Sequence, residues 1–252
     1  MLLANVLVMV NTPVPLASDR ALNVDRLRKP GIWPKSIKDC KVLELGCGVG
    51  LTGLVAASLG AKLTLLTDLN VVVERVTEQN VVLNKKAFGI GQAVFAVPLC
   101  WGSREDENIC RNILGEYASK NTAVRKGKKS KKKNLSKSTQ GVASTESMLA
   151  VPDIILIGDV AYQHKPGAPS HFDILIETLL NFASNRDTLV IFGTRMRMPA
   201  SSDLLDMFYE HFDEVVKPPV EASELDNGFH EKNLGKNSMI TLHFFKRKQA
   251  GH

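Results

Sequence analysis

Three glycines stand in the stretch Gly46-Cys47-Gly48-Val49-Gly50, directly after the apolar run KVLEL at 41–45. Glycine has no Cβ, so a turn of this composition lets a ligand approach the backbone closely. A glycine turn between a first strand and its helix occurs at sites that bind nucleotides and related ligands. The residues around this turn indicate which ligand fits.

The best-known phosphate-binding patterns are missing from this turn. A dinucleotide-binding turn reads Gly-x-Gly-x-x-Gly, and its last glycine lets the helix pack closely on the strand. Here Leu51 occupies that position. A P-loop needs Gly-Lys-Ser/Thr, and no lysine follows Gly50. The turn therefore indicates close contact with a ligand that makes no demand for pyrophosphate.

An acidic residue, Asp68, ends the next apolar run, KLTLLTD at 62–68. A carboxylate at this place can accept hydrogen bonds from both hydroxyls of a ribose and would repel a 2′-phosphate. Together the turn and Asp68 favour an adenosine-like ligand over the alternative of a purely structural glycine turn.

The surrounding stretches alternate between strand-like and helix-like patterns, which predicts an α/β fold with a mainly parallel sheet covered on both faces. Helices are expected from Leu51 to Leu59, over 71–84 and on either side of 188–194. Val72, Val76 and Leu83 are expected near one face of the helix at 71–84. The expected strands are 41–45, 62–68, 93–99, 152–159, 188–194 and 238–246.

The first ten residues, MLLANVLVMV, are apolar but too short to span a bilayer. They also lack the basic flank and cleavage site of a secretory signal. We expect either a buried strand or a loosely held terminus here.

The periodic pattern stops between Ser103 and about Ala150, and disorder is expected for 119–148. Residues 125–137 hold eight Lys or Arg, whereas the chain has a net charge of +6, so the rest carries −2. A domain-wide nucleic-acid-binding face is therefore not supported. The basic segment is a nuclear localisation signal, an inert linker, or a contact for RNA or an acidic partner.

Four cysteines are present, without a Cys-x-x-Cys pair or a histidine in register with them. This argues against a zinc site and against a secreted disulfide framework, and it fits a reducing compartment. We expect no metal.

The stretch VLELGCGVGLTGLVAASLGAKLTLLTDLN, at 42–70, closely resembles the first motifs of seven-strand (class I) S-adenosyl-L-methionine-dependent methyltransferases. Within them it resembles the protein-lysine methyltransferases called family 16. EQNVVLN (78–84), the Trp-Gly of LCWG (99–102) and the Asp-x-x-Tyr of GDVAY (158–162) match in order. The resemblance covers roughly 42–102 and 152–246.

This resemblance implies a doubly wound, mainly parallel, Rossmann-like seven-stranded sheet in the order 3-2-1-4-5-7-6, whose last strand is antiparallel. The methyltransferase domain would be 41–252, with the lysine-rich insertion at about 119–148. Residues 1–40 would be a divergent or truncated N-terminal segment. Only eight residues separate Trp33 from Val42, too few for the helix that the family places there. Trp33 is therefore a displaced remnant of the family's cofactor-contacting Trp, or unrelated to it.

The resemblance also implies the residues that bind the cofactor, S-adenosyl-L-methionine. The turn would line its methionine moiety, Asp68 would hold the ribose, and an aromatic ring would flank the adenine. The expected cofactor-binding residues are Gly46, Cys47, Gly48, Asp68, Trp101 and Gly158.

Asp159 and Tyr162 follow a buried strand, at the sheet edge where α/β proteins bind ligands. A carboxylate and a phenol there can orient a lysine ammonium and let it lose a proton. Methyltransferases that act on nucleobase amines usually have an (Asn/Asp)-Pro-Pro-(Tyr/Phe) turn, and this chain has Asp-Val-Ala-Tyr. We therefore expect Asp159 and Tyr162 to be catalytic, with a side-chain amine as the acceptor.

The predicted function is methylation of a lysine ε-amine on a protein substrate. The alternatives are a methyltransferase for nucleic acid, another protein side chain or a small molecule, and a catalytically degenerate cofactor-binding module. We expect a monomer in the cytoplasm or nucleus, with no membrane or nucleic-acid partner.

Overall fold

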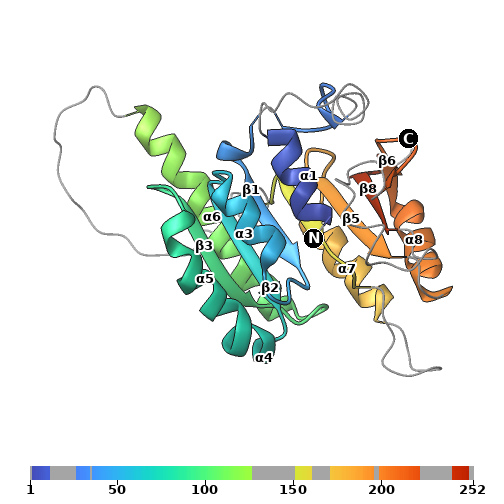
Figure 1. Ribbon diagram of the computed structural model, residues 1–252, viewed down its shortest axis with the longest axis horizontal. Coiled ribbons are helices and arrows are strands. Elements are labelled where there is room, and N and C mark those ends of the chain that lie inside the picture. The colour runs from blue at the N-terminus through green and yellow to red at the C-terminus, as the bar shows by residue number, and fades with distance from the viewer. Residues whose placement is uncertain are drawn as a thin grey trace, which may run out of the picture.

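A computed structural model describes residues 2–11, 27–34, 36–126, 151–160, 171–195, 199–221 and 240–249. One sheet runs through the molecule, and helices cover both of its faces (Figure 1). Its strands are β1 (Lys41–Leu45), β2 (Leu63–Asp68), β3 (Ala93–Pro98), β4 (Ile154–Ile157), β5 (Leu189–Arg195), β6 (Phe212–Glu214), β7 (Val220–Glu221) and β8 (Ile240–Arg247).

The strand order is β3-β2-β1-β4-β5-β8-β6. Strands β1 to β5 pair in parallel, and β8 is antiparallel to β5. The short strands β6 and β7 both pair with β8, on the side away from β5, so they share one edge position. The predicted order 3-2-1-4-5-7-6 is therefore confirmed, with the edge strand split in two.

Alternate residues of each central strand enter two apolar cores. In β1, Leu43 and Leu45 enter one core and Val42 enters the other. Helices α6 (Arg104–Lys126), α7 (Phe172–Phe182) and α8 (Pro199–His211) contribute to the first core. Helices α1 (Leu2–Asn11) and α3 (Leu51–Ser58) contribute to the second. Because both faces are covered, the residues free to bind ligands lie at the strand ends.

The N-terminal run is a helix, so the prediction of a strand or a loose terminus is wrong. Its buried residues Leu3, Val6, Leu7 and Val10 recur at spacings of three and four, which is one face of a helix. That face joins the same core as Ala56 of α3. The apolar content of this segment was evident in the sequence. Burial of one face against α3 is what makes the segment a helix.

Helix α6 corrects a second expectation, because residues 119–126 are helical rather than disordered. Ser103 begins the helix, with its Oγ accepting from the Asp106 backbone N–H at 3.3 Å. Cys110 and Leu114 are fully buried four residues apart and anchor the first turns against the sheet. A helix that has been nucleated extends at low cost through residues such as those at 119–126. Residues 127–150 lie outside the described part of the chain.

The helical segment after β2 is interrupted by one π-helical stretch. It comprises α4 (Asn70–Val72), the π-helical η2 (Val73–Thr77) and α5 (Glu78–Asn84). A π-turn holds an extra residue, so it rotates the following residues relative to an α-helix. Val73 and Thr77 are consequently buried, whereas Val76 and Leu83 are 36% and 77% exposed. Val76 and Leu83, which the sequence places near one face with Val72, are therefore not part of the buried face.

Short 3₁₀ turns complete the described structure at η1 (Ile37–Asp39) and η3 (Lys85–Ala87). Among the described helices, none has the length and apolar character needed to cross a membrane.

Candidate functional site

The glycine turn lies at the carboxyl end of β1, between this strand and α3. Gly46, Gly48 and Gly50 have φ angles of 66°, 53° and 78°, in the left-handed region that glycine adopts without strain. The Cys47 N–H donates to the Thr67 carbonyl at 2.9 Å, which ties the turn to β2. A Cβ built on Gly48 would meet no atom of the described residues within 4 Å, so the described structure leaves space against the backbone there. The turn can therefore accept a ligand against its backbone.

Asp68 ends β2 beside this turn. Its Oδ2 accepts from the Gly48 N–H and its Oδ1 from the Leu69 N–H, each at 2.8 Å. A carboxylate offers about four acceptor positions, so both oxygens retain capacity for two hydroxyl donors. The side chain is half-buried. Asp68 thus lies where the sequence predicts it, and it also fixes the shape of the turn.

Trp101 and Gly158 come to the same edge from β3 and β4. A Cβ on Gly46 would lie 3.4 Å from Cζ2 of Trp101 and 2.9 Å from Cγ1 of Val160, so only glycine lets these groups meet. The turn after Trp101 is fixed because the Gly102 N–H donates to Thr178 Oγ1 at 2.8 Å. No atom of the described residues would lie within 4 Å of a Cβ built on Gly158. These predicted residues therefore converge around the end of β1.

Cys47 contributes its backbone rather than its thiol. The Cys47 Sγ lies 3.7 Å from Thr77 Oγ1, and the residue is 8% exposed. Burial, with Glu44 nearby, raises the pKa of this thiol to about 12. It therefore stays a protonated thiol at neutral pH and packs against the neighbouring helical segment.

Thr77 and Asn80 are residues of this site to which the sequence interpretation gave no role. The Thr77 hydroxyl donates to the Gly48 carbonyl at 2.8 Å, and the Asn80 amide donates to the Val49 carbonyl at 2.9 Å. Because Asp68 accepts from the Gly48 N–H, three side chains in all form hydrogen bonds with the backbone of the turn. Asn80 stands in the matched motif EQNVVLN, which was the available signal. Thr77 faces the turn because it lies in the π-helical stretch, and no pattern in the sequence indicated that stretch.

Glu44 lies beneath the turn and is 3% exposed. Its Oε2 accepts from the Gly53 N–H of α3 at 2.9 Å. Burial raises the pKa of this carboxyl to about 7, although the Gly53 hydrogen bond lowers it. Glu44 thereby joins β1 to the first turn of the helix that follows the glycines.

The acceptor side of the site begins at Asp159, directly after Gly158. The Val160 N–H donates to the Gly158 carbonyl at 2.9 Å, a tight turn that leaves Asp159 exposed. Because Ile157 pairs with Phe192 of β5, this turn stands beside the carboxyl end of β5. Tyr162, the other predicted catalytic residue, lies outside the described residues.

Trp33 lies at the opposite edge of the sheet. It is 8% exposed, in a core with Ile37 and Cys40, and it lines a hollow with Asp153 and Leu189. These neighbours stand at the amino ends of β1, β4 and β5, so Trp33 is placed away from the glycine turn. It packs in the apolar core here, at the opposite edge of the sheet from the glycine turn.

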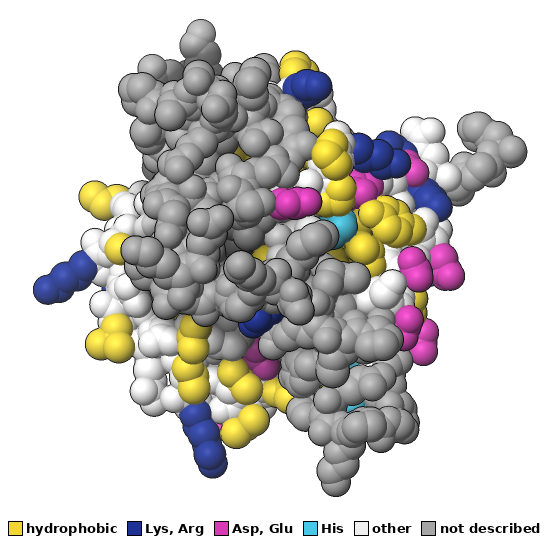
Figure 2. Space-filling model, turned by 45° about the vertical axis from the view of Figure 1, so that its right-hand side comes forward, with side chains coloured by type: hydrophobic (Ala, Val, Ile, Leu, Met, Phe, Trp, Pro, Cys, Tyr) yellow, Lys and Arg dark blue, Asp and Glu magenta, His cyan; other side chains and the backbone are white. Residues whose placement is uncertain are grey.

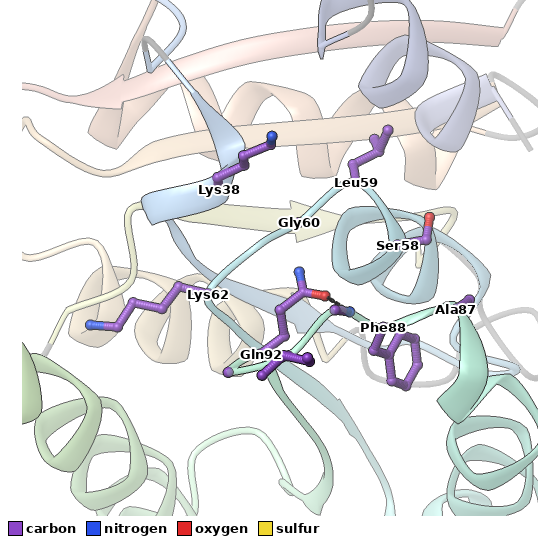
Figure 3. A pocket seen from close by; sticks show the side chains of 11 residues that line it. Lys38, Ser58, Leu59, Gly60, Lys62, Ala87, Phe88 and Gln92 are labelled. Atoms are coloured by element: carbon purple, nitrogen blue, oxygen red, sulfur yellow. Dashed lines mark hydrogen bonds between the residues drawn. The ribbon is translucent and has the colours of Figure 1, made fainter.

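A second hollow at this amino edge is shown in Figure 3, where Gln92 stands between Gly60 and Phe88. Gln92 donates to the carbonyls of Ala57 and Ala61 at 2.9 and 3.1 Å, which makes it a structural link between α3 and β3. Within the described ranges, no three His, Cys, Asp or Glu side chains are grouped as a metal site.

Comparisons with known proteins agree with this geometry. Residues 24–118 match the sequence model of a family described as lysine methyltransferase. The chain is 38% identical over 52 residues to a ribosomal protein L11 methyltransferase of Acetivibrio thermocellus, covering 20% of this chain and 17% of that protein. It is 40% identical over 48 residues to the protein of the same name from Ruminiclostridium cellulolyticum, covering 19% and 15%. The matched segment thus spans about a sixth of these relatives.

Among solved structures, a ribosomal protein L11 methylase from Lactobacillus delbrueckii subsp. bulgaricus aligns with a TM-score of 0.43 and 16% identity. The alignment covers 92% of this chain and 78% of that one. Gly48 and Asp68 meet at the end of β1, as the resemblance stated from the sequence implies. The strand order is thus the one that the resemblance to the class I S-adenosyl-L-methionine-dependent methyltransferases predicts, and residues 24–118 match the family model described as lysine methyltransferase.

Proposed function

We propose that this protein transfers a methyl group from S-adenosyl-L-methionine to a lysine ε-amine of another protein. The observation that carries the proposal is the meeting of Gly48, Asp68, Trp101 and Gly158 at the ends of four different segments, with Asp159 directly beside them. The methyl acceptor of a cofactor bound there would enter beside the Asp159 carboxylate.

The described residues of the site fit S-adenosyl-L-methionine, a cofactor that has no pyrophosphate to be bound. Gly48 and Gly158 leave open the space that a Cβ would fill, and Asp68 keeps acceptor capacity for a ribose. The Trp101 ring beside Gly46 offers an apolar surface for a base. These residues would hold the cofactor, whose sulfonium supplies an activated methyl group.

The remaining task of the protein is to bring the acceptor into line and to let its ammonium lose a proton to water. Positioning of two reactants supplies a large part of the barrier reduction in such a displacement. A lysine amine, with a reference pKa of about 10.4, must lose a proton before it can attack. Asp159 is exposed at the site edge, where its negative charge can draw in and orient the ammonium. Tyr162, the second catalytic residue predicted from the sequence, would assist Asp159 in this role.

Two observations favour a protein acceptor. The matching family model is described as lysine methyltransferase, and the names of both bacterial relatives specify a ribosomal protein. On the face shown in Figure 2, the described Lys and Arg side chains stand apart or beside acidic ones and form no continuous basic patch for nucleic acid. We further propose that the enzyme acts in the cytoplasm or nucleus.

Incubation of the purified protein with methyl-labelled cofactor and cell extract tests the substrate class. We expect label in protein, and mass spectrometry should then locate an added methyl group on lysine. Label that runs only with RNA or with small molecules would contradict the lysine assignment. Cofactor binding without transfer to any component would favour a binding module.

Two variants separate cofactor binding from catalysis. Asp68→Ala removes an acceptor of the Gly48 N–H and of the ribose, so calorimetry should show severely weakened cofactor binding. Asp159→Ala should bind the cofactor normally and lose methyl transfer. Unchanged affinity in the first variant, or full activity in the second, would remove that residue from its assigned role.

A further inference from the structure

The outer edge of β3 forms one end of the sheet. Strand β3 stands last in the strand order, and no other described strand pairs with its outer side. Its sequence, Ala-Val-Phe-Ala-Val-Pro, has no charged residue. Natural sheets usually protect such an edge with charges, bulges or a covering element, because an open apolar edge pairs with other strands.

The hydrogen bonds of β3 identify the groups that face outward. The Ala93 N–H donates to the Lys62 carbonyl at 3.1 Å, and the Leu99 N–H donates to the Asp68 carbonyl at 2.9 Å, both toward β2. Backbone groups alternate in direction along a strand. The N–H and C=O groups of Val94 and Ala96 therefore point away from β2. Pro98 occupies the next outward position, where its missing N–H breaks no bond to β2.

We propose that β3 pairs with β3 of a second copy of this chain, antiparallel and centred on Phe95. In that register Val94 of each copy stands opposite Ala96 of the other. Each such pair exchanges two backbone hydrogen bonds, as in an antiparallel ladder. The two-fold axis passes between the paired strands at Phe95, and Pro98 ends the ladder at both sides. The outward backbone groups of β3 in one copy are thus complementary to the same groups of β3 in the other copy.

The side chains agree with this register. Phe95 is 38% exposed, and its ring lies 6.0 Å from that of Tyr117 on α6, at an interplanar angle of 66°. At the centre of the pairing the two Phe95 residues form a non-hydrogen-bonded pair, whose Cα atoms approach to about 4.5 Å. Aromatic side chains stabilise such cross-strand pairs. The pairing would cover the exposed part of each Phe95 ring.

The charges at the two ends of β3 favour a second copy over an unrelated strand. Lys85 and Lys86 are exposed shortly before β3 begins. Glu105 and Asp106 follow its other end, where Asp106 accepts from the Cys100 N–H at 2.9 Å. Antiparallel pairing places the basic end of one copy beside the acidic end of the other, so attraction acts twice across the axis. The proposal departs from the monomer expected from the sequence, and it does not depend on the proposed reaction.

Sedimentation velocity of the full chain tests the pairing. We expect a concentration-dependent species of twice the chain mass of 27.6 kDa. Phe95→Lys and Phe95→Glu should each abolish it, because like charges would stand directly opposite. A mixture of the two variants should restore it, since Lys then faces Glu. Ile174→Lys, at a similarly exposed position on α7 (39%), is the matched control and should leave the dimer intact.

Hydrogen exchange supplies a second measurement on the wild-type chain. The Val94 and Ala96 amides should exchange more slowly as the concentration rises, whereas the Phe95 amide, which faces β2, should be protected throughout. A wild-type chain that remains monomeric at its highest soluble concentration would overturn the proposal. Slow exchange of Val94 and Ala96 at every concentration would also overturn it, by showing that the same chain covers the edge.

Discussion

The buried carboxyl of Glu44 gives the sharpest quantitative prediction. It lies beneath the glycine turn, 3% exposed, with Oε2 accepting from the Gly53 N–H at 2.9 Å. Burial raises its pKa from 4.5 to about 7. Glu44→Gln keeps the size and the carbonyl acceptor while removing the titration, so it isolates the effect of the charge.

The direction of the pH effect on stability follows from which state, folded or unfolded, binds the Glu44 proton more tightly. The folded protein holds the Glu44 proton up to about pH 7, whereas the unfolded chain releases it near 4.5. The contribution of Glu44 to the free energy of unfolding is therefore full below pH 4.5, decreases as the pH rises, and is lost above about 7. The difference between the two pKa values corresponds to about 3 kcal/mol.

Urea unfolding, measured at several pH values across this window, tests the prediction. The free energy of unfolding of the wild type should include a decrease of about 3 kcal/mol from this group, and Glu44→Gln should lack that decrease. Glu105→Gln, at an exposed position, is the control and should follow the wild type. If Glu44→Gln and the wild type show the same pH dependence, Glu44 is either ionised in the folded state or reached by water, and the reasoning fails.

Two further substitutions test the contacts around the turn. In Gly53→Ala the new Cβ would lie 2.1 Å from Cδ2 of Leu66, so we expect a loss of about 1–3 kcal/mol in urea unfolding; unchanged stability would show that α3 can move off β2. Thr77→Val leaves the Gly48 carbonyl without its donor, which should weaken cofactor binding about tenfold in calorimetry. Thr77→Ser should retain the affinity, and equal losses in both variants would mean that the lost packing matters rather than the hydroxyl.

The region of the candidate cofactor site could be proposed from the sequence because its determinants are local. The glycines at 46–50 and Asp68 each end a short apolar run. Parallel strands bring their carboxyl ends to one edge of a sheet, so residues at those ends must meet there. The strand order came with the family resemblance, and the pairing of β1 with β2 and β4 agrees with it.

Other features depend on contacts between segments far apart in the chain, which a linear pattern does not display. The apolar content of the first ten residues was plain, but burial against α3 made them a helix rather than a strand. Trp33 lies at the amino edge of the sheet. Its neighbours there, including Leu189, are distant in the sequence and come together only in the folded chain.

The sequence by itself determined the α/β fold, the position of the glycine turn and the place of Asp68, because each depends on residues close together in the chain. Tertiary structure alone decided that Thr77 donates to Gly48, that burial raises the pKa of Glu44 and that Val94 and Ala96 face outward. The physical reason is that hydrogen bonding and burial are set by neighbours in space, and those neighbours exist only once the sheet has formed.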